Sequence, residues 1–266
     1  MNRLRLPLDI TMTVFSIVLM GSAYLFPAEI VHEIIGMVMF ALWAVHIVLN
    51  HCWYGAVFRG RYNARRILQT IINCSILVCV IFLMISGIFL SNHIFTFLRI
   101  ESGLGFARIA HLLASHWYYM YMSLHIGLHV EMLAEKFRIP RKGVSAIILR
   151  VVFLLLSLYG IYAFLTRGIW RYLILQQQFF FLDLERGYVL FFLDYISIII
   201  LFATGIHYLK KLLQKRKIRE VKKLENINDS ENSGLKTFLF PFFFTMLYIS
   251  TSVAQFIITK TIIFKK

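Results

Sequence analysis

Long apolar runs separated by short polar segments make up most of this sequence. Each run is long enough to cross the hydrocarbon core of a bilayer as an α-helix, which takes about 20 residues. The pattern therefore predicts an all-α integral membrane protein with seven transmembrane helices. The runs cover residues 8–26, 28–53, 67–91, 108–133, 144–166, 188–208 and 235–263.

The polar segments divide the chain into four parts. Residues 1–135 hold the first four runs, which we expect to form one bundle. Residues 136–208 add two helices joined by an aromatic outer connector. Residues 209–234 are basic and then rich in Asn, Ser and Glu, and they predict a helical extension that leads into a cytoplasmic linker. Residues 235–266 hold the last run.

Composition and charge agree with a membrane setting. Hydrophobic residues are 59% of the chain and charged residues 15%, which is more apolar than a soluble core of this size requires. The formal net charge of +15 lies almost entirely between the apolar runs. We interpret it as a signal of topology and lipid headgroup contact, not of nucleic-acid binding. The three cysteines form no CxxC motif, so no disulfide framework or zinc ribbon is predicted.

The positions of lysine and arginine predict the orientation. They collect at the amino terminus and in segments 54–66, 134–143 and 209–225. These segments fall on one side if every run crosses once, and that side is expected to be the cytoplasm. The same count makes the second and fourth helices parallel.

Two pairs of histidines stand out on these two helices. His32 and His46 are fourteen residues apart, and so are His111 and His125. On an α-helix, this spacing puts both rings within about 40° of one face and about 21 Å apart along the axis. If the helices are parallel, His32 faces His111 and His46 faces His125.

Facing imidazole pairs indicate haem. A haem iron can be held by histidine on each side, and polar side chains inside a membrane usually serve a site. We therefore predict His32, His46, His111 and His125 as axial ligands of two b-type haems. Arg108, Arg65 and Arg66 are candidate partners of the haem propionates because they lie near the helix ends.

The other histidines are weaker candidates. His129 lies on nearly the same face as His111 and is the runner-up for the inner ligand. The remaining four are expected to be interfacial or hydrogen-bonded, and they are His51, His93, His116 and His207.

A family resemblance rests on these residues. The phrases HEIIG at 32–36, HIVLN at 46–50, SGIFLS at 86–91 and HIGLH at 125–129, together with His111, resemble the flavinylation-associated cytochrome family of bacterial membrane proteins. The resemblance implies haem on the histidine-bearing helices and extracytoplasmic electron transfer with flavin-carrying proteins. The paired spacing is also similar to the two-haem core of respiratory cytochrome b.

No flavin site is visible in this chain, because it has neither a GxGxxG fingerprint nor a DGxTGAT-type flavinylation sequence. We therefore predict an electron-transfer subunit that works between a membrane quinone pool and an extracytoplasmic flavoprotein. Asp183 and Glu185 in the aromatic connector are candidate acceptors of quinol protons.

Two alternatives remain open. HLLASH at 111–116 and HIGLH at 125–129 have spacings like those of histidine boxes in membrane di-iron oxygenases, although no HxxHH box is present. The other alternative is a transporter or structural membrane protein without a cofactor.

Overall fold

The computed structural model describes residues 2–26, 28–57, 59, 63–98, 102–179 and 187–225. Over this part of the chain the protein is helical and contains no strand, so the expectation of an all-α membrane protein is confirmed. The chain divides into two compact units, Met1–Arg216 and Lys217–Lys266. Of the second unit, the structure describes only the end of one helix.

The described elements follow the expected runs closely. They are α1 (Asn2–Leu25), α2 (Glu29–Leu49), α3 (His51–Val57), α4 (Ala64–Leu90), the 3-10 turn Thr96–Leu98, α5 (Leu104–Lys136), α6 (Val144–Thr166), α7 (Ile169–Leu173) and α8 (Gly187–Glu225). The second run ends earlier than expected, at Leu49, and a separate short helix follows it. The aromatic connector contains α7, and the basic segment after residue 208 continues α8, as expected from the sequence.

Five of the described helices are long and apolar enough to cross a membrane. The candidate spans are Leu4–Ser22, Glu29–Leu49, Ala64–Leu90, Val144–Thr166 and Gly187–Gln214. The fourth expected span, α5, forms a helix of 33 residues but is not among them. The seventh expected run, 235–263, lies outside the described residues.

Several polar side chains of helix α5 face other helices. His116, Tyr119 and Ser123 are each no more than 1% exposed. The Tyr119 hydroxyl donates to the carbonyl of Tyr195 on α8 at 2.8 Å. A helix of this length extends about 50 Å, more than the hydrocarbon core requires. These polar side chains are therefore buried by contacts with neighbouring helices.

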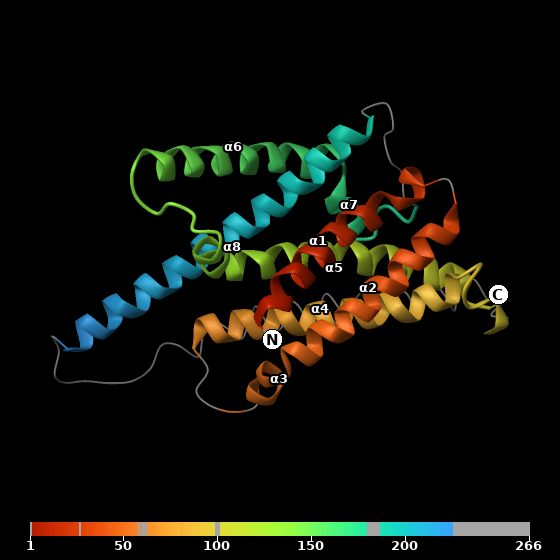
Figure 1. Cartoon of the computed structure of the whole chain (residues 1–266), viewed down its shortest axis with the longest axis horizontal. Coiled ribbons are helices and arrows are strands. Elements are labelled where there is room, and N and C mark those ends of the chain that lie inside the picture. Colours follow the sequence, from red (N-terminus) through yellow and green to blue (C-terminus); the bar gives the residue numbers. More distant parts are fainter. Residues whose placement is uncertain are drawn as a thin grey trace. The chain divides into compact units, whose positions relative to one another are not determined.

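The first four long helices form two hairpins, which Figure 1 shows side by side in the first unit. In one hairpin, the Arg5 guanidinium on α1 donates to the Leu49 carbonyl at the end of α2, at 2.6 Å. In the other, the Asn63 side chain caps α4 by accepting from the Arg66 amide at 2.9 Å. Helices α4 and α5 then pack against each other along their length.

Helix α8 approaches α5 and α6 closely because both present glycines to it. A Cβ atom at Gly127 would collide with the backbone of Ala203, and one at Gly160 with the carbonyl of Ser197. Small residues allow helix backbones to approach each other in membranes, where dispersion contacts replace the hydrophobic effect. A buried ion pair joins α8 to the end of α6, because the Arg167 Nε donates to Asp194 at 2.7 Å.

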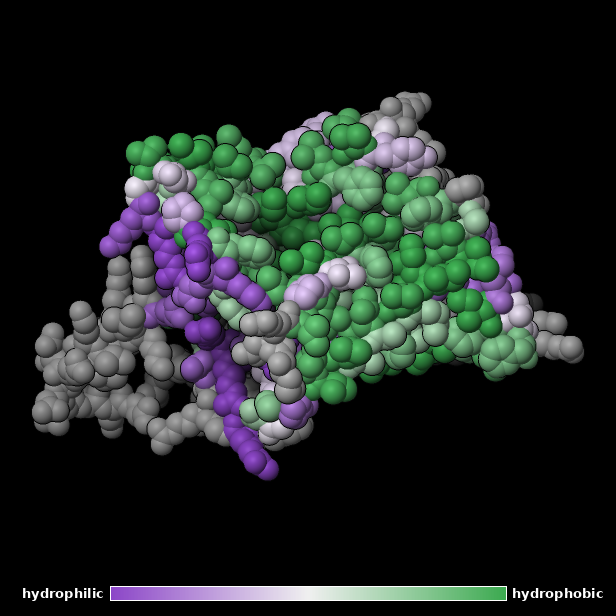
Figure 2. Space-filling model, in the orientation of Figure 1, coloured by the Kyte–Doolittle hydropathy of each residue, from purple (hydrophilic) through white to green (hydrophobic). Residues whose placement is uncertain are grey.

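The outward surface is apolar, as expected for a protein in contact with lipid. Side chains on α6 such as Ile147, Leu154 and Leu158 are more than half exposed. Figure 2 shows hydrophobic side chains over the broad middle of one face, with hydrophilic ones gathered towards its ends. Such an apolar area on a protein of this kind marks the part that the bilayer covers.

Replacing Gly160 with alanine tests the close packing of α6 on α8. The added methyl has no space against the Ser197 carbonyl, so we expect a loss of about 1–3 kcal/mol of stability. Thermal unfolding in detergent, followed by circular dichroism, measures it. Gly205→Ala is the matched control, since a Cβ atom there meets nothing within 4 Å. Equal melting temperatures for the two variants would contradict the packing described.

Candidate functional site

A cavity of about 460 Å³ lies among α1, α2, α4 and α5. Its size is within the range of about 300–1,000 Å³ that small-molecule and cofactor sites occupy. Its walls are mostly aliphatic, aromatic and methionine side chains, with a few polar groups. These polar groups include His32, Glu33, Arg108, His111 and Ser115.

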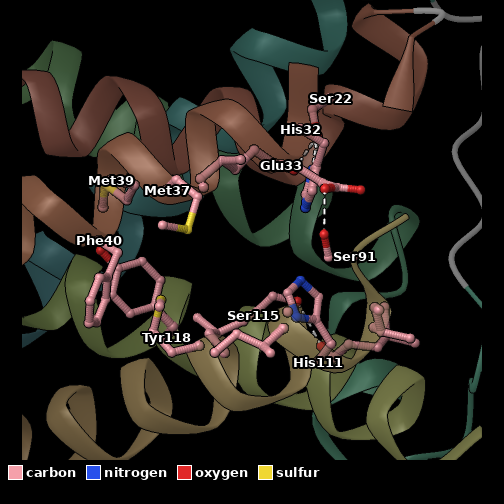
Figure 3. Close-up of a pocket in the computed structure, with 18 of the residues that line it drawn as sticks. Ser22, His32, Glu33, Met37, Met39, Phe40, Ser91, His111, Ser115 and Tyr118 are labelled. Carbon is pink, nitrogen blue, oxygen red and sulfur yellow. Dashed lines mark hydrogen bonds between the residues drawn. The ribbon is translucent and has the colours of Figure 1, made fainter. Parts of the chain in front are cut away.

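Two of the predicted ligands face each other in this cavity. Figure 3 shows the rings of His32 on α2 and His111 on α5 pointing toward one another. Their centroids are 6.1 Å apart and their planes are inclined by 61°. An imidazole nitrogen lies about 2 Å from a metal ion that it binds, so two rings on opposite sides of one ion have centres about 6 Å apart. The separation is therefore that of two axial ligands of one metal.

Hydrogen bonds from neighbouring helices orient these two rings. The Ser22 hydroxyl donates to the Leu19 carbonyl at 3.0 Å, so its oxygen accepts from His32 Nδ1. In the same way, the Ser86 hydroxyl donates to the Phe82 carbonyl at 2.6 Å and accepts from His111 Nδ1 at 3.0 Å. A neutral imidazole that carries its proton on Nδ1 keeps the lone pair on Nε2. Both Nε2 atoms are therefore in the state that binds metal.

His46 and His125 are held by the same kind of contact. His46 Nδ1 donates to the Asp9 carboxylate at 2.9 Å, and His125 Nδ1 donates to the Asn73 amide oxygen at 2.9 Å. Both acceptors lack a proton to give, so these contacts also leave the lone pair on Nε2. His46 lies within electrostatic range of His125. Because His32 meets His111 and His46 approaches His125, α2 and α5 run in the same direction.

The four contacts form two layers with one repeated design. The His32 layer consists of His32 and His111 with Ser22 and Ser86, and the His46 layer consists of His46 and His125 with Asp9 and Asn73. The ligands are fourteen residues apart on α2 and α5, and their partners are thirteen apart on α1 and α4. Since each partner helix is antiparallel to its ligand helix, nearly equal spacings place one partner in each layer.

The four partners Asp9, Ser22, Asn73 and Ser86 were not predicted from the sequence. One signal could have identified all four residues. Each is a polar side chain in or beside an apolar run, and they form two pairs at the same spacing of thirteen. Metal-binding histidines usually donate their other ring nitrogen to such a partner.

The structure also brings His129 to the His46 layer. Its ring centroid is 4.8 Å from that of His125, and it lies within electrostatic range of Asp9 and His46. His116 is buried in the wall of the same cavity, with its ring stacked on Tyr172 at 4.2 Å.

The three arginines named from the sequence have different surroundings. Arg108 is exposed and lines the cavity beside the His32 layer. Arg65 is exposed at the start of α4. The Arg66 guanidinium donates to the carbonyls of Ala56 and Arg59, so it holds the turn between α3 and α4.

Glu33 fastens the rim of the cavity. Its carboxylate accepts from the Ser91 hydroxyl at 2.6 Å, the Asn92 amide at 2.8 Å and the Ile94 amide at 3.0 Å. Figure 3 shows the contact with Ser91 next to the His32 ring. The carboxylate therefore ties the chain after α4 to the first turns of α2.

Two glycines keep space open near the rings. A Cβ atom at Gly36, one turn after His32, would meet no atom within 4 Å. At Gly87, the added atom would lie 3.9 Å from the His111 ring. Both residues line the cavity, so larger side chains at these positions would occupy it.

Within the described ranges, no three histidine, cysteine or acidic side chains gather as a metal site. A haem iron takes only its axial ligands from the protein, because the macrocycle supplies the others.

Comparisons of the chain with protein-family models, curated proteins and solved structures found no match.

Replacing Glu33 with glutamine tests its role at the rim. The amide accepts fewer hydrogen bonds and loses the charge, so we expect a loss of about 1–3 kcal/mol and faster proteolysis in segment 91–98. Thermal unfolding and timed proteolysis measure these effects. Glu135→Gln is the control, because that carboxylate is 67% exposed and pairs only with Arg141 among the described residues. Equal stability of the two variants would show that Glu33 does not fasten the rim.

Proposed function

We propose that this protein carries electrons across a membrane through two b-type haems, each held between α2 and α5. The observation that carries this proposal is the His32–His111 pair, with ring centroids 6.1 Å apart and both Nδ1 atoms held by serine oxygens. Haem bound in this way supplies one-electron chemistry at a metal.

The residues of the His32 layer fit a haem. Two imidazoles present Nε2 lone pairs at the spacing of axial ligands, and the cavity beside them is apolar with a cation, Arg108, in its wall. Gly36 and Gly87 leave room in the cavity for a flat ring. The protein's part is to hold the ligand rings in fixed orientations and to exclude water from the metal.

The His46 layer supports a second haem by the same logic. Its ligands are His46 and His125, each with Nδ1 held by an acceptor on the neighbouring helix. His129 is the runner-up for His125. The two layers are about 21 Å apart along the helices, so two haem sites would cover most of the hydrocarbon core.

The orientation and partners follow from the charge distribution and the resemblance. The basic segments place the His46 layer near the cytoplasm and the His32 layer near the outer face, in a bacterial inner membrane. The resemblance to flavinylation-associated cytochromes implies a flavin-carrying partner outside, and a membrane quinone is the other redox partner. The candidate proton acceptors Asp183 and Glu185 lie outside the described residues.

The pyridine haemochrome ratio of haem to protein tests the proposal on detergent-purified protein. We expect two haems per chain, and one in each of His46→Ala and His111→Ala, because each variant loses one axial ligand. His125→Ala and His129→Ala separate the two candidates for the inner ligand, since only the true ligand should cost a haem. A colourless protein from haem-sufficient cells would overturn the proposal, and iron analysis would then decide between a di-iron oxygenase and a membrane protein without a cofactor.

A cavity-filling variant tests the position of the outer haem. The side chain of Gly36→Leu would occupy the open space beside His32, so we expect loss of one haem of two with an unchanged helix content. Gly205→Leu is the control, because it makes the same change on a membrane helix at a position open on all sides. Two haems in Gly36→Leu would place the haem elsewhere.

A further inference from the structure

The two layers differ in the charge of one hydrogen-bond partner. Ser22, Ser86 and Asn73 are neutral acceptors for His32, His111 and His125. Asp9 is a carboxylate, and it accepts from His46 Nδ1 at 2.9 Å. The His46 layer therefore has an anionic partner on a ligand ring, whereas both ligand partners in the His32 layer are uncharged.

A carboxylate partner changes the ligand that it contacts. It draws the Nδ1 proton toward itself and makes the imidazole a stronger electron donor through Nε2. A stronger donor favours the ferric over the ferrous state, and hydrogen bonding around the ligands is one of the means by which proteins set reduction potentials. The side chains of Asp9 and His46 are 43% and 26% exposed, so the effect is moderate.

Other charged groups lie near both layers, but they are not hydrogen-bonded to the four paired histidines in the described contacts. In the His46 layer, Lys210 reaches His129 electrostatically, but its Nζ is committed to Glu131 at 2.7 Å and to the Leu128 carbonyl at 3.2 Å. Arg65 is exposed at the start of α4, where solvent screens its charge.

In the His32 layer, Glu33 is an anion that acts on His32 through space, and its carboxylate is hydrogen-bonded to Ser91, Asn92 and Ile94. Arg108 in the cavity wall carries the opposite charge. Neither is hydrogen-bonded to a ligand ring by any described contact. Among the described residues, the Asp9 carboxylate is thus the charged group that is hydrogen-bonded to a proposed ligand.

We infer that Asp9 is a positioning residue that makes the His46 layer the lower-potential site, so that electrons run from this layer to the His32 layer. This inference rests on the proposed function. With the expected orientation, electrons then leave the cytoplasmic side for the outer face. A membrane quinol oxidised at the His46 layer is the reductant, and it gives up two electrons and two protons as it becomes a quinone. This route does not use Asp183 and Glu185, which belong to the outer connector. The oxidised flavin of an outer protein is the acceptor. Between the layers, one electron moves at a time, and no bond forms or breaks.

Redox titration of single-haem proteins tests the order of potentials. His111→Ala retains the haem of the His46 layer, and His46→Ala retains that of the His32 layer. We expect a lower midpoint potential in His111→Ala. Adding Asp9→Asn to His111→Ala should raise that potential, by a roughly tenfold change in the ratio of reduced to oxidised haem, which is about 59 mV for a one-electron couple.

Three further variants identify the cause. Asp9→Glu in the His111→Ala background should keep the lower potential, because it retains the carboxylate. Glu135→Gln should leave the potential unchanged, since it removes an exposed charge expected on the same side without touching a histidine. Asn73→Asp in the same background should lower the midpoint potential further. This variant tests the effect of a carboxylate partner if Asp9→Asn cannot hold haem.

Two results would overturn the inference, namely a higher midpoint potential in His111→Ala than in His46→Ala, or potentials that do not respond to Asp9→Asn and Asn73→Asp. Both require haem-loaded protein, so they differ from failure of the proposed function, in which no variant binds haem.

Discussion

The arrangement of the first four long helices depends on the hydrogen bond at Nδ1 of each paired histidine. An imidazole among apolar side chains must give its N–H to an acceptor, because an unpaired polar group in such surroundings costs several kcal/mol. Each acceptor lies on a neighbouring antiparallel helix, so the bond couples α1 to α2 and α4 to α5. The same bond fixes which nitrogen keeps its lone pair. One interaction thus sets both the pairing of the helices and the chemical state of the ligands.

The bundle is tight on one side and hollow on the other. Gly127 and Gly160 let α8 approach the backbones of α5 and α6, which leaves no room even for a methyl group. Between α2 and α5, side chains stand back and leave a cavity of about 460 Å³. Close packing resists deformation, so the tight side gives α5 a fixed position from which it faces the cavity. A cofactor site needs ligands that stay in place when the cofactor is absent as well as present.

The two layers repeat one arrangement of residues with small chemical changes. The histidines and their spacing are the same in both layers. Their partners are two serines in the His32 layer, and an aspartate and an asparagine in the His46 layer. If haem binds as proposed, the geometry sets where the iron lies, and the partner of each imidazole sets how readily the iron is reduced. Direction can arise in this way without a large difference in fold.

The sequence by itself determined the all-helical membrane class and the residues of five apolar spans. The length and hydropathy of a helix are local properties, and they decide whether it can cross a bilayer. The sequence also predicted that His32 faces His111, since a fourteen-residue spacing on two helices leaves few other registers. Tertiary structure decided what local properties cannot specify. The helix over 108–133 was also predicted from its apolar run, but only its neighbours account for the burial of its histidines. The Nδ1 partners of these rings come from other helices, as does the glycine contact at Gly127. Such contacts join residues far apart in the chain, so they exist only once the helices have packed.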